Sequence, residues 1–333
     1  MRRIERRRFL LAAGALAAAP LARAQRSGEK RILGVLSPHP KPTPEQNAYW
    51  GHEAKFRELG WRIGENLLLE RPEDPRGEAA LAEMAEGLVR KRVDAILTIG
   101  PEAAVAAARA TRTIPIVFWG VAQPVEQGLI ASYAQPGGNV TGVAFFTGTE
   151  LNAKVIEVLR EVAAHVRRVG ILVTPSAMMS VGGGRIRESG PGAAQLLGLD
   201  SRRYPVANAA DIDAALDNAL RAGAQGIIVY GTTTTFRQRQ RIAEFALRHR
   251  LASASNQEEF VQAGFLFSYG ANARQTLLQA IACVAKVLGG AHAADIPVER
   301  PERYELAVNL KTAEGLGVTV PRSLLLRADK VFE

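Results

Sequence analysis

Short runs of β-forming residues alternate with amphipathic helical stretches along most of the chain. One helical stretch closes at Gly60, and glycine commonly ends helices. Another is predicted by Leu81, Met84, Ala85 and Leu88, which share one helical face. Strands are predicted at residues 32–36, 67–70, 94–99, 114–121, 169–173, 226–230 and 251–255. This alternation predicts an α/β architecture in which helices cover both faces of parallel sheets.

The predicted strands form two series, separated by a turn-rich segment at residues 135–139. The chain has 333 residues, more than a single hydrophobic core usually supports. Residues 94–100 and 225–231 are similar strand runs, and each ends at a Gly before a helix. In open α/β sheets, ligands bind just beyond such carboxyl ends. We therefore predict two similar α/β lobes with a ligand cleft between them that closes by hinge motion.

The first 24 residues have the features of an export signal. An arginine-rich start precedes an apolar stretch from Phe9 to Ala22 and a small-residue cleavage site at residues 22–24. The apolar stretch is shorter than the roughly 20 residues that span a bilayer, so we expect no stable membrane insertion. Arg6 and Arg7, followed by residues 8–10, resemble a twin-arginine signal. We expect cleavage after about Ala24 and a periplasmic mature protein.

Charge and cysteine content narrow the function classes further. The signal holds six Arg and one Glu, so the formal net charge of +9 falls to +4 without it. The remaining basic residues are dispersed and lack the interleaved aromatic residues of a nucleic-acid surface. The only cysteine, Cys283, excludes an internal disulfide and a lipid-attachment cysteine near the cleavage site. It lies in an apolar helical pattern, which predicts a buried, unreactive thiol.

The sequence contains no recognisable catalytic or metal-binding constellation. The histidines are scattered, without a His-x-x-x-His or Cys-x-x-Cys pair to hold a metal. The glycines at residues 182–184 lack the rest of a phosphate loop, and no Gly-x-Ser-x-Gly elbow occurs. We therefore predict a non-enzyme that needs neither a metal nor a cofactor.

Several blocks of the chain resemble exported substrate-binding proteins of ABC transporters, of the tryptophan and amino-acid uptake type. The resemblance runs from about Arg31 to Glu333 and is most specific in the C-terminal blocks at residues 304–317 and 321–329. Three further blocks match in order, at residues 113–118, 136–142 and 259–270. Residues 304–310 also alternate as a half-buried strand does, and Pro321 is predicted to start a final helix.

The resemblance implies a type I periplasmic-binding fold, with two doubly wound lobes joined by three crossovers near residues 144, 267 and 302. Lobe 1 would combine residues 31–143 with 268–301, and lobe 2 residues 144–267 with 302–333. It also implies a monomer that captures a small molecule and delivers it to an ABC permease driven by a separate ATPase subunit.

Ligand contacts are expected in the strand-end loops and at the crossovers. The helix start after Gly100 is an expected anion site, because Pro101 suits a first helical turn and the amides after it are free. Trp119 and Tyr230 would stack on a planar ligand. Relatives usually carry Asp where this chain has Gln123, so a partner for a ligand ammonium is missing there. The expected contacts are Ser37, Gly100, Pro101, Glu102, Ala103, Trp119, Val121, Gln123, Tyr230, Asn256, Glu259 and Tyr269.

Two other functions remain open from the sequence. A periplasmic sensor would use the same closure to engage a signalling receptor, and nothing in the chain separates it from a transport protein. An exported enzyme would need an acid–base pair in the cleft, for which Glu102 and Glu259 are the candidates.

Overall fold

The first lobe is built on a parallel sheet of five strands. The computed structural model describes residues 30–74, 76–145, 149–175, 180–182 and 198–333, so the predicted export signal lies outside the described residues. The strands follow the order β2-β1-β3-β4-β5. Their bounds are β1 Arg31–Leu36, β2 Leu67–Glu70, β3 Ala95–Ile99, β4 Ile116–Val121 and β5 Val140–Ala144.

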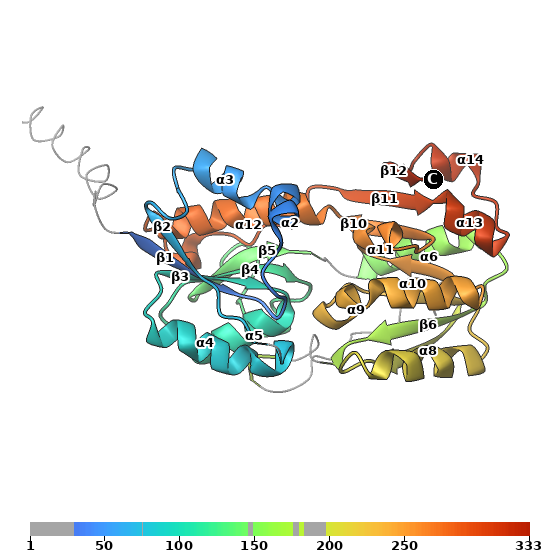
Figure 1. Cartoon of the computed structure of the whole chain (residues 1–333), viewed down its shortest axis with the longest axis horizontal. Helices are drawn as coiled ribbons and strands as arrows, with labels where there is room; N and C mark the ends of the chain where they lie inside the picture. Colours follow the sequence, from blue (N-terminus) through green and yellow to red (C-terminus); the bar gives the residue numbers. More distant parts are fainter. Residues whose placement is uncertain (1–29, 75, 146–148, 176–179, 183–197) are drawn as a thin grey trace, which may run out of the picture.

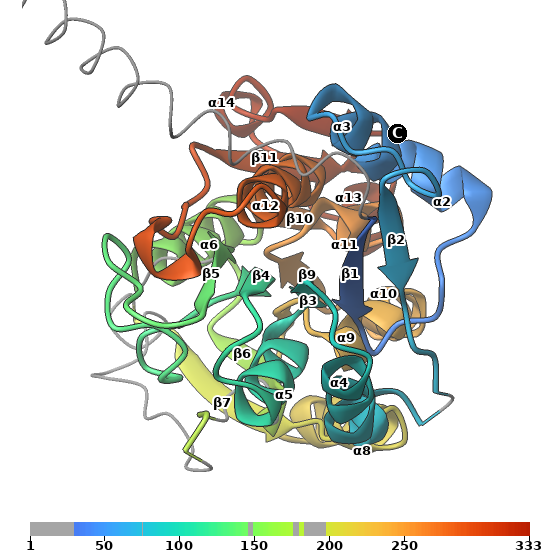
Figure 2. The ribbon, with the colours of Figure 1, turned by 90° about the vertical axis from the view of Figure 1, so that its left-hand side faces the viewer.

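Helices cover both faces of this first sheet, as Figure 2 shows. Helices α4 and α5 pack through Met84 and Ala104 on one face. Helices α3 and α12 pack through Phe56 and Ile281 on the other. The bounds are α2 Pro44–Trp50, α3 His52–Glu58, α4 Leu81–Arg90, α5 Pro101–Ala110 and α12 Ala273–Leu288, with short 3₁₀ turns at Gly77–Ala80 and Ala293–Asp295.

The second lobe is built on a sheet of seven strands in the order β12-β11-β10-β9-β8-β6-β7. All neighbouring strands are parallel except β10 and β11, which are antiparallel. The strands are β6 Arg168–Val173, β7 Asp200–Pro205, β8 Gly226–Val229, β9 Ala252–Ser255, β10 Phe267–Ala271, β11 Tyr304–Asn309 and β12 Lys330–Phe332.

Helices again cover both faces of the second sheet. One core holds Leu159 of α6 and Leu324 of α14, and the opposite core holds Leu216 of α8 and Ile242 of α10. The bounds are α6 Thr149–Val162, α8 Asp211–Arg221, α9 Thr233–Arg237, α10 Arg239–Arg248, α11 Glu258–Gln262, α13 Leu310–Leu316 and α14 Arg322–Leu325. The prediction of two doubly wound α/β lobes is confirmed (Figure 1).

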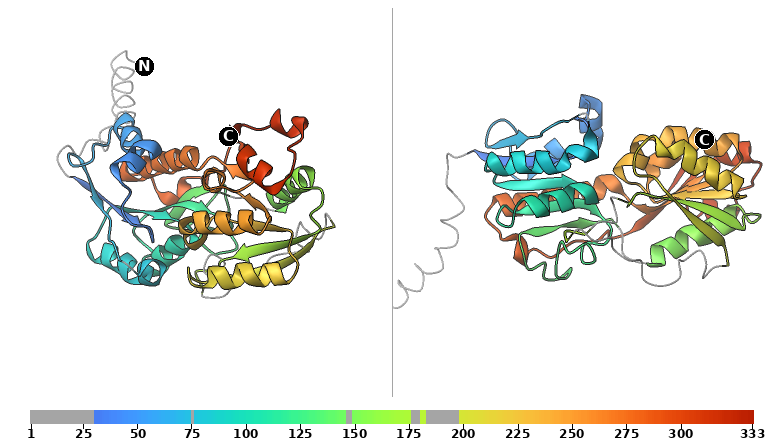
Figure 3. Two further views of the ribbon diagram at one scale, coloured as in Figure 1. Left: turned by 45° about the vertical axis from the view of Figure 1, so that its right-hand side comes forward. Right: turned by 90° about the horizontal axis from the view of Figure 1, so that it is seen from below.

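The chain passes between the two lobes more than once, and the views in Figure 3 show the lobes side by side. One passage follows β10, because residues 267–271 pair with β9 and β11 in the second sheet whereas α12 packs on the first. The sequence layout placed this passage near residue 267 and assigned residues 268–271 to lobe 1. The full division into lobes stays a prediction.

The C-terminal blocks contribute to the core of the second lobe. The predicted half-buried strand at residues 304–310 is present as β11 and buries Leu306 and Val308. The helix predicted to start at Pro321 is the short α14, for which Pro321 is the N-cap. These blocks therefore stabilise the fold and lie away from the strand ends of the first lobe.

Candidate ligand-binding site

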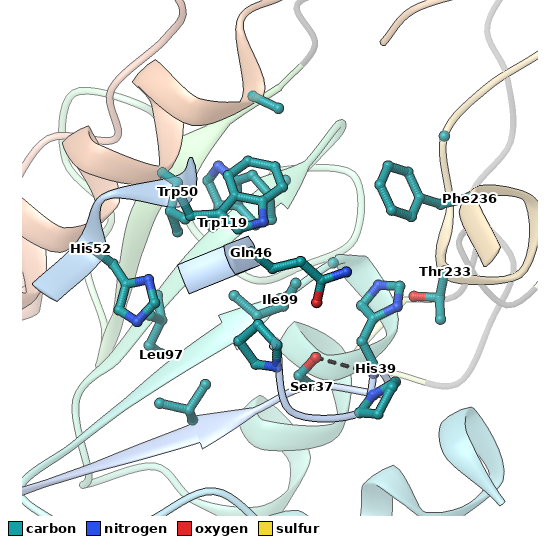
Figure 4. Close-up of a pocket in the computed structure, with 18 of the residues that line it drawn as sticks. Ser37, His39, Gln46, Trp50, His52, Leu97, Ile99, Trp119, Thr233 and Phe236 are labelled. Atoms are coloured by element: carbon teal, nitrogen blue, oxygen red, sulfur yellow. Dashed lines mark hydrogen bonds between the residues drawn. The ribbon is translucent and has the colours of Figure 1, made fainter. Parts of the chain in front are cut away.

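A cavity of about 460 Å³ lies where the carboxyl ends of the strands in the two lobes face each other. This volume is in the range of pockets that hold small organic ligands. Its walls come from the strand-end loops of both lobes and from α2, α3 and α12. Figure 4 shows residues of the first lobe on one side and Thr233 and Phe236 of the second lobe on the other.

Loops that follow strands of the first lobe reach the cavity. Ser37 and His39 follow β1, and the Ser37 hydroxyl accepts a hydrogen bond from the His39 amide at 3.1 Å. Gly100 follows β3 with a φ of 87°, a left-handed conformation that favours glycine. A Cβ at Gly100 would lie 3.7 Å from Thr233 Oγ1, so the two lobes approach closely at this point.

The second lobe contributes a turn after β8 that side-chain hydrogen bonds hold in place. The Gly231 amide donates to Asn256 Oδ1 at 2.9 Å, and the hydroxyls of Thr174 and Thr232 lie 2.8 Å apart. A Cβ at Gly231 would meet the side-chain amide of Gln257 at 2.4 Å, so glycine is needed to seat Gln257 against the cavity. These contacts position the start of α9, where Phe236 reaches toward the first lobe.

One end of the cavity is an apolar chamber between α12 and the first sheet. Leu97, Leu277 and Ile281 line it. Trp119 packs edge to face against Trp50, with ring centroids 5.8 Å apart. The Trp119 indole also donates to Thr276 Oγ1 at 3.1 Å. The indole orientation is therefore set before any ligand binds, which suits a ring or hydrocarbon group.

The other end of the cavity is rich in positive charge. Arg71, Arg237 and Arg239 all line it. Burial, and after it the charges of the same three arginines, lowers the pKa of His39 to about 4. No carboxylate contributes to that shift, so cations dominate the field at this imidazole, which is neutral at pH 7.

Among the described residues, Glu259 is the one acidic side chain that lines the cavity. It is buried, and burial followed by the charge of Glu258 raises its pKa above the usual range. Among the described residues, its Oε2 atom has no hydrogen-bond partner. This oxygen is available to a hydrogen-bond donor on a ligand.

Five of the predicted contact residues line the cavity: Ser37, Gly100, Pro101, Trp119 and Glu259. Glu102 and Ala103 are buried in the first turn of α5, although the Glu102 carboxylate lies beside Gly100. Because Glu102 is not part of the lining, the two carboxylates of the enzyme alternative do not face one common cavity.

The other predicted contacts are not part of the described lining. Val121 is fully buried in the core of the first lobe. The ring of Tyr269 packs against Tyr304. Asn256 supports the Gly231 turn, and neither Gln123 nor Tyr230 is part of the lining. Direct ligand contact by these residues remains a prediction.

Several lining residues were missed by the sequence reasoning. Their positions after strands gave a signal for His39 and Arg71, which follow β1 and β2. Further along the chain from the turn after β8, α9 and the start of α10 bring Phe236, Arg237 and Arg239 to the cavity. No sequence signal marks the residues from packed helices. The missed residues include His39, Gln46, Trp50, His52, Arg71, Phe145, Thr233, Phe236, Arg237, Arg239 and Gln257.

Three further features of the described residues bear on possible functions. Within the described ranges, no group of three or more His, Cys, Asp or Glu residues is placed to hold a metal ion. None of the described helices combines the length and apolar character needed to cross a membrane. Cys283 is buried, and burial raises the pKa of its thiol to about 12.

A family model and one curated relative match most of the chain. The family model described as "ABC transporter substrate binding protein" matches residues 44–332. A tyrosine-binding protein of Clostridioides difficile (strain R20291) is 23% identical over 292 residues, which cover 87% of this chain and 82% of that protein.

Two solved structures share the fold. A Streptococcus pneumonia ABC domain in complex with L-Trp has a TM-score of 0.78 at 21% identity, covering 91% of this chain and 100% of that one. A conserved domain protein from Vibrio cholerae has a TM-score of 0.77 at 23% identity, covering 91% and 99%. These matches support the fold of both lobes over most of the chain.

Proposed function

Because the chain belongs to the ABC transporter substrate-binding protein family, we propose that it is the exported binding component of an importer. It captures a small molecule between its lobes and delivers it to a membrane permease, which a separate ATPase subunit drives. The observation that carries this proposal is the cavity lined by the strand ends of both lobes. A ligand in such a cavity contacts both lobes only when they are close together, so binding favours the closed arrangement.

The proposed ligand is an amino acid or a related small carboxylate or aromatic compound. The relatives named above include a tyrosine-binding protein and a domain in complex with L-Trp. The apolar chamber beside Trp50 and Trp119 suits a ring, and the arginines at the opposite end suit a carboxylate. Reversible capture needs no acid–base pair, in keeping with a lining that brings Glu259 but not Glu102 to the cavity.

The proposal includes export, with residues 1–24 as a cleaved twin-arginine-like signal and a periplasmic monomer as the mature form. A monomer suits the role because each pair of lobes must open freely. Expression of the full chain, fractionation and N-terminal sequencing would test this part. A mature N-terminus near Gln25 in the periplasmic fraction is expected, and an uncleaved cytoplasmic chain would contradict it.

Native mass spectrometry of the mature protein as purified tests the binding role, followed by a thermal-shift panel of amino acids, carboxylates and small aromatic compounds. A ligand above its dissociation constant raises the melting temperature because it binds only the folded state. We expect a co-purified or strongly stabilising small molecule that is unchanged after incubation. Absence of any stabilising compound, or conversion of one into a product, would contradict the proposed role.

A further inference from the structure

The charges that line the cavity do not balance. In the described part of the lining, Arg71, Arg237 and Arg239 face a single carboxylate, that of Glu259. The pKa values of His39 and His52, which also line the cavity, are lowered by burial. Among the described residues, none of the three guanidinium groups forms an ion pair with a carboxylate. Arg71 donates hydrogen bonds to the carbonyls of His39 and Pro40, and Arg239 donates one to the carbonyl of Phe236.

One of the arginines, Arg71, is also incompletely satisfied as a donor. Arg71 Nε is buried and has no hydrogen-bond partner within the part of the chain that the structure describes. The guanidinium of Arg239 lies over the Phe236 ring, 4.4 Å from its centroid. All three groups act on the ring of His39, so their positive charges converge on one region. A guanidinium without a carboxylate partner, beside a cavity with an apolar chamber, is best compensated by an anion that accepts charge-assisted hydrogen bonds.

The apolar chamber adjoins this cationic region within the same cavity. An amphipathic ligand would therefore place its charged group among the arginines and its hydrocarbon body beside Trp119, Leu277 and Ile281. A zwitterion would leave the surplus positive charge uncompensated, because its own ammonium cancels its carboxylate. The Glu259 oxygen without a partner can accept a hydrogen bond from any donor. A hydroxyl or an amide supplies such a donor as well as an ammonium does.

Building on the proposed function, we propose that the site selects organic anions: a carboxylate held by the three arginines, with a ring-sized apolar body in the chamber and no required ammonium. An amino acid would bind through its carboxylate and side chain, and its ammonium would add nothing. The determinant of ligand class in this chain is thus the Arg71, Arg237 and Arg239 cluster, which we call the arginine cluster.

Isothermal titration of the mature protein with four matched compounds tests this inference. 3-Phenylpropionate carries the carboxylate alone, L-phenylalaninamide the ammonium alone, L-phenylalanine both and 3-phenylpropionamide neither. We expect 3-phenylpropionate to bind at least tenfold more tightly than either amide, and L-phenylalanine to bind no more tightly than 3-phenylpropionate. The inference would be overturned if an amide bound as tightly as the corresponding acid. It would also be overturned if L-phenylalanine bound tenfold more tightly than 3-phenylpropionate.

Arginine variants test whether the preference for a carboxylate comes from the arginine cluster. Arg237→Gln and Arg239→Gln should each weaken 3-phenylpropionate binding by roughly tenfold or more, which is the usual loss for a hydrogen bond to a charged group, and leave 3-phenylpropionamide unchanged. Arg248→Gln, on the exposed C-terminal turn of α10 outside the cavity, is the matched control and should change neither. Arg71 is left intact because it also holds the loop at His39 and Pro40. Equal losses for the acid and the amide would contradict a charge-selective cluster.

The titrations distinguish a failure of the organic-anion inference from a failure of the proposed binding function. If none of the four compounds binds while the wider panel yields another ligand, the binding role stands and the ring-bearing anion is wrong. If no compound of either set binds, the proposed function fails together with the inference.

Discussion

The imidazole of His39 in the first lobe meets the phenyl ring of Phe236 in the second lobe edge to face, with ring centroids 6.0 Å apart. The guanidinium of Arg239 also packs over the face of the Phe236 ring. A single aromatic side chain thus contacts the opposite lobe and orients one member of the arginine cluster.

We predict that Phe236→Ala weakens ligand binding by roughly fivefold to tenfold, because the closed arrangement loses an aromatic pair worth about 1 kcal/mol. Calorimetry with the strongest ligand of the thermal-shift panel would measure the loss. Phe245→Ala is the matched control, since that ring packs against His249 on α10 outside the cavity. Equal affinities for the wild type and Phe236→Ala would show that this contact does not support closure.

The lowered pKa of His39 predicts a loss of stability in acid. The pKa is about 4 in the folded protein and near 6.5 in the unfolded chain. Between these values the unfolded chain binds a proton that the folded chain does not, so the free energy of unfolding falls as the pH falls, by at most about 1.4 kcal/mol per pH unit. Denaturant titrations from pH 7 to pH 4 should show a shallower decline for His39→Gln than for the wild type. His165→Gln, at an exposed position, controls for loss of a histidine, and parallel curves for His39→Gln and the wild type would contradict the prediction.

The raised pKa of Glu259 predicts the opposite effect, a loss of stability as the pH rises. Burial raises its pKa in the folded protein, so folding is favoured most while the carboxyl is protonated, and stability is lost as the pH rises from about 4.5 through the folded-state value. Glu259→Gln cannot ionise, and its free energy of unfolding should improve relative to the wild type between pH 4.5 and pH 8. Glu244→Gln, at an exposed position of α10, is the control. A constant difference between Glu259→Gln and the wild type across that range would refute the expected burial effect.

Two glycines close in the sequence, Gly138 before β5 and Gly142 within it, should differ sharply in their tolerance of alanine. At Gly142, with a φ of 150°, a Cβ would lie 2.1 Å from the Phe118 carbonyl oxygen, so the backbone of β4 would have to move. We predict that Gly142→Ala destabilises the protein by about 3 kcal/mol or more. At Gly138 a Cβ would meet no atom within 4 Å, and Gly138→Ala should change stability by less than about 0.5 kcal/mol. Chemical denaturation of both variants measures the contrast, and similar values for the two would be inconsistent with the packing described.

Tryptophan fluorescence should report ligand binding. The chain has three tryptophans, of which Trp50 and Trp119 line the cavity and Trp61 does not. An apolar ligand body that displaces water from the chamber should shift the emission to shorter wavelength. The change should persist in Trp61→Phe and be largely lost in Trp119→Phe. A ligand-dependent change that disappears only in Trp61→Phe would place the ligand elsewhere.

Much of the fold could be predicted from local patterns. The run at residues 94–100 and its counterpart at residues 225–231 both form strands that end beside the cavity, as β3 and β8. Their apolar composition and terminal glycines were sufficient to predict both strands, because these features depend only on residues that are neighbours in the sequence. Strand β7, Asp200–Pro205, was missed because its outward residues are polar and its burial comes from Tyr204 alone.

The site was less predictable because its walls come from packing between distant segments. Trp50 of α2 and Leu277 of α12 share the chamber, and no local pattern links them. Glu259 and Trp119 were identified because they lie at strand ends or near them. Asn256 also lies just after a strand, but its side chain accepts a hydrogen bond from the Gly231 amide. Position in a loop therefore indicated proximity to the cavity, and only the structure separates lining residues from their supports.

Recovery of a ligand from the mature protein after calorimetric titration tests the central claim, reversible capture in the cavity, most directly. The mature protein is titrated with the strongest panel compound, denatured, and the released compound is identified by mass spectrometry. We predict one ligand per chain, recovered unchanged. A compound recovered as product, or the absence of saturable binding by every compound tested, would contradict the account.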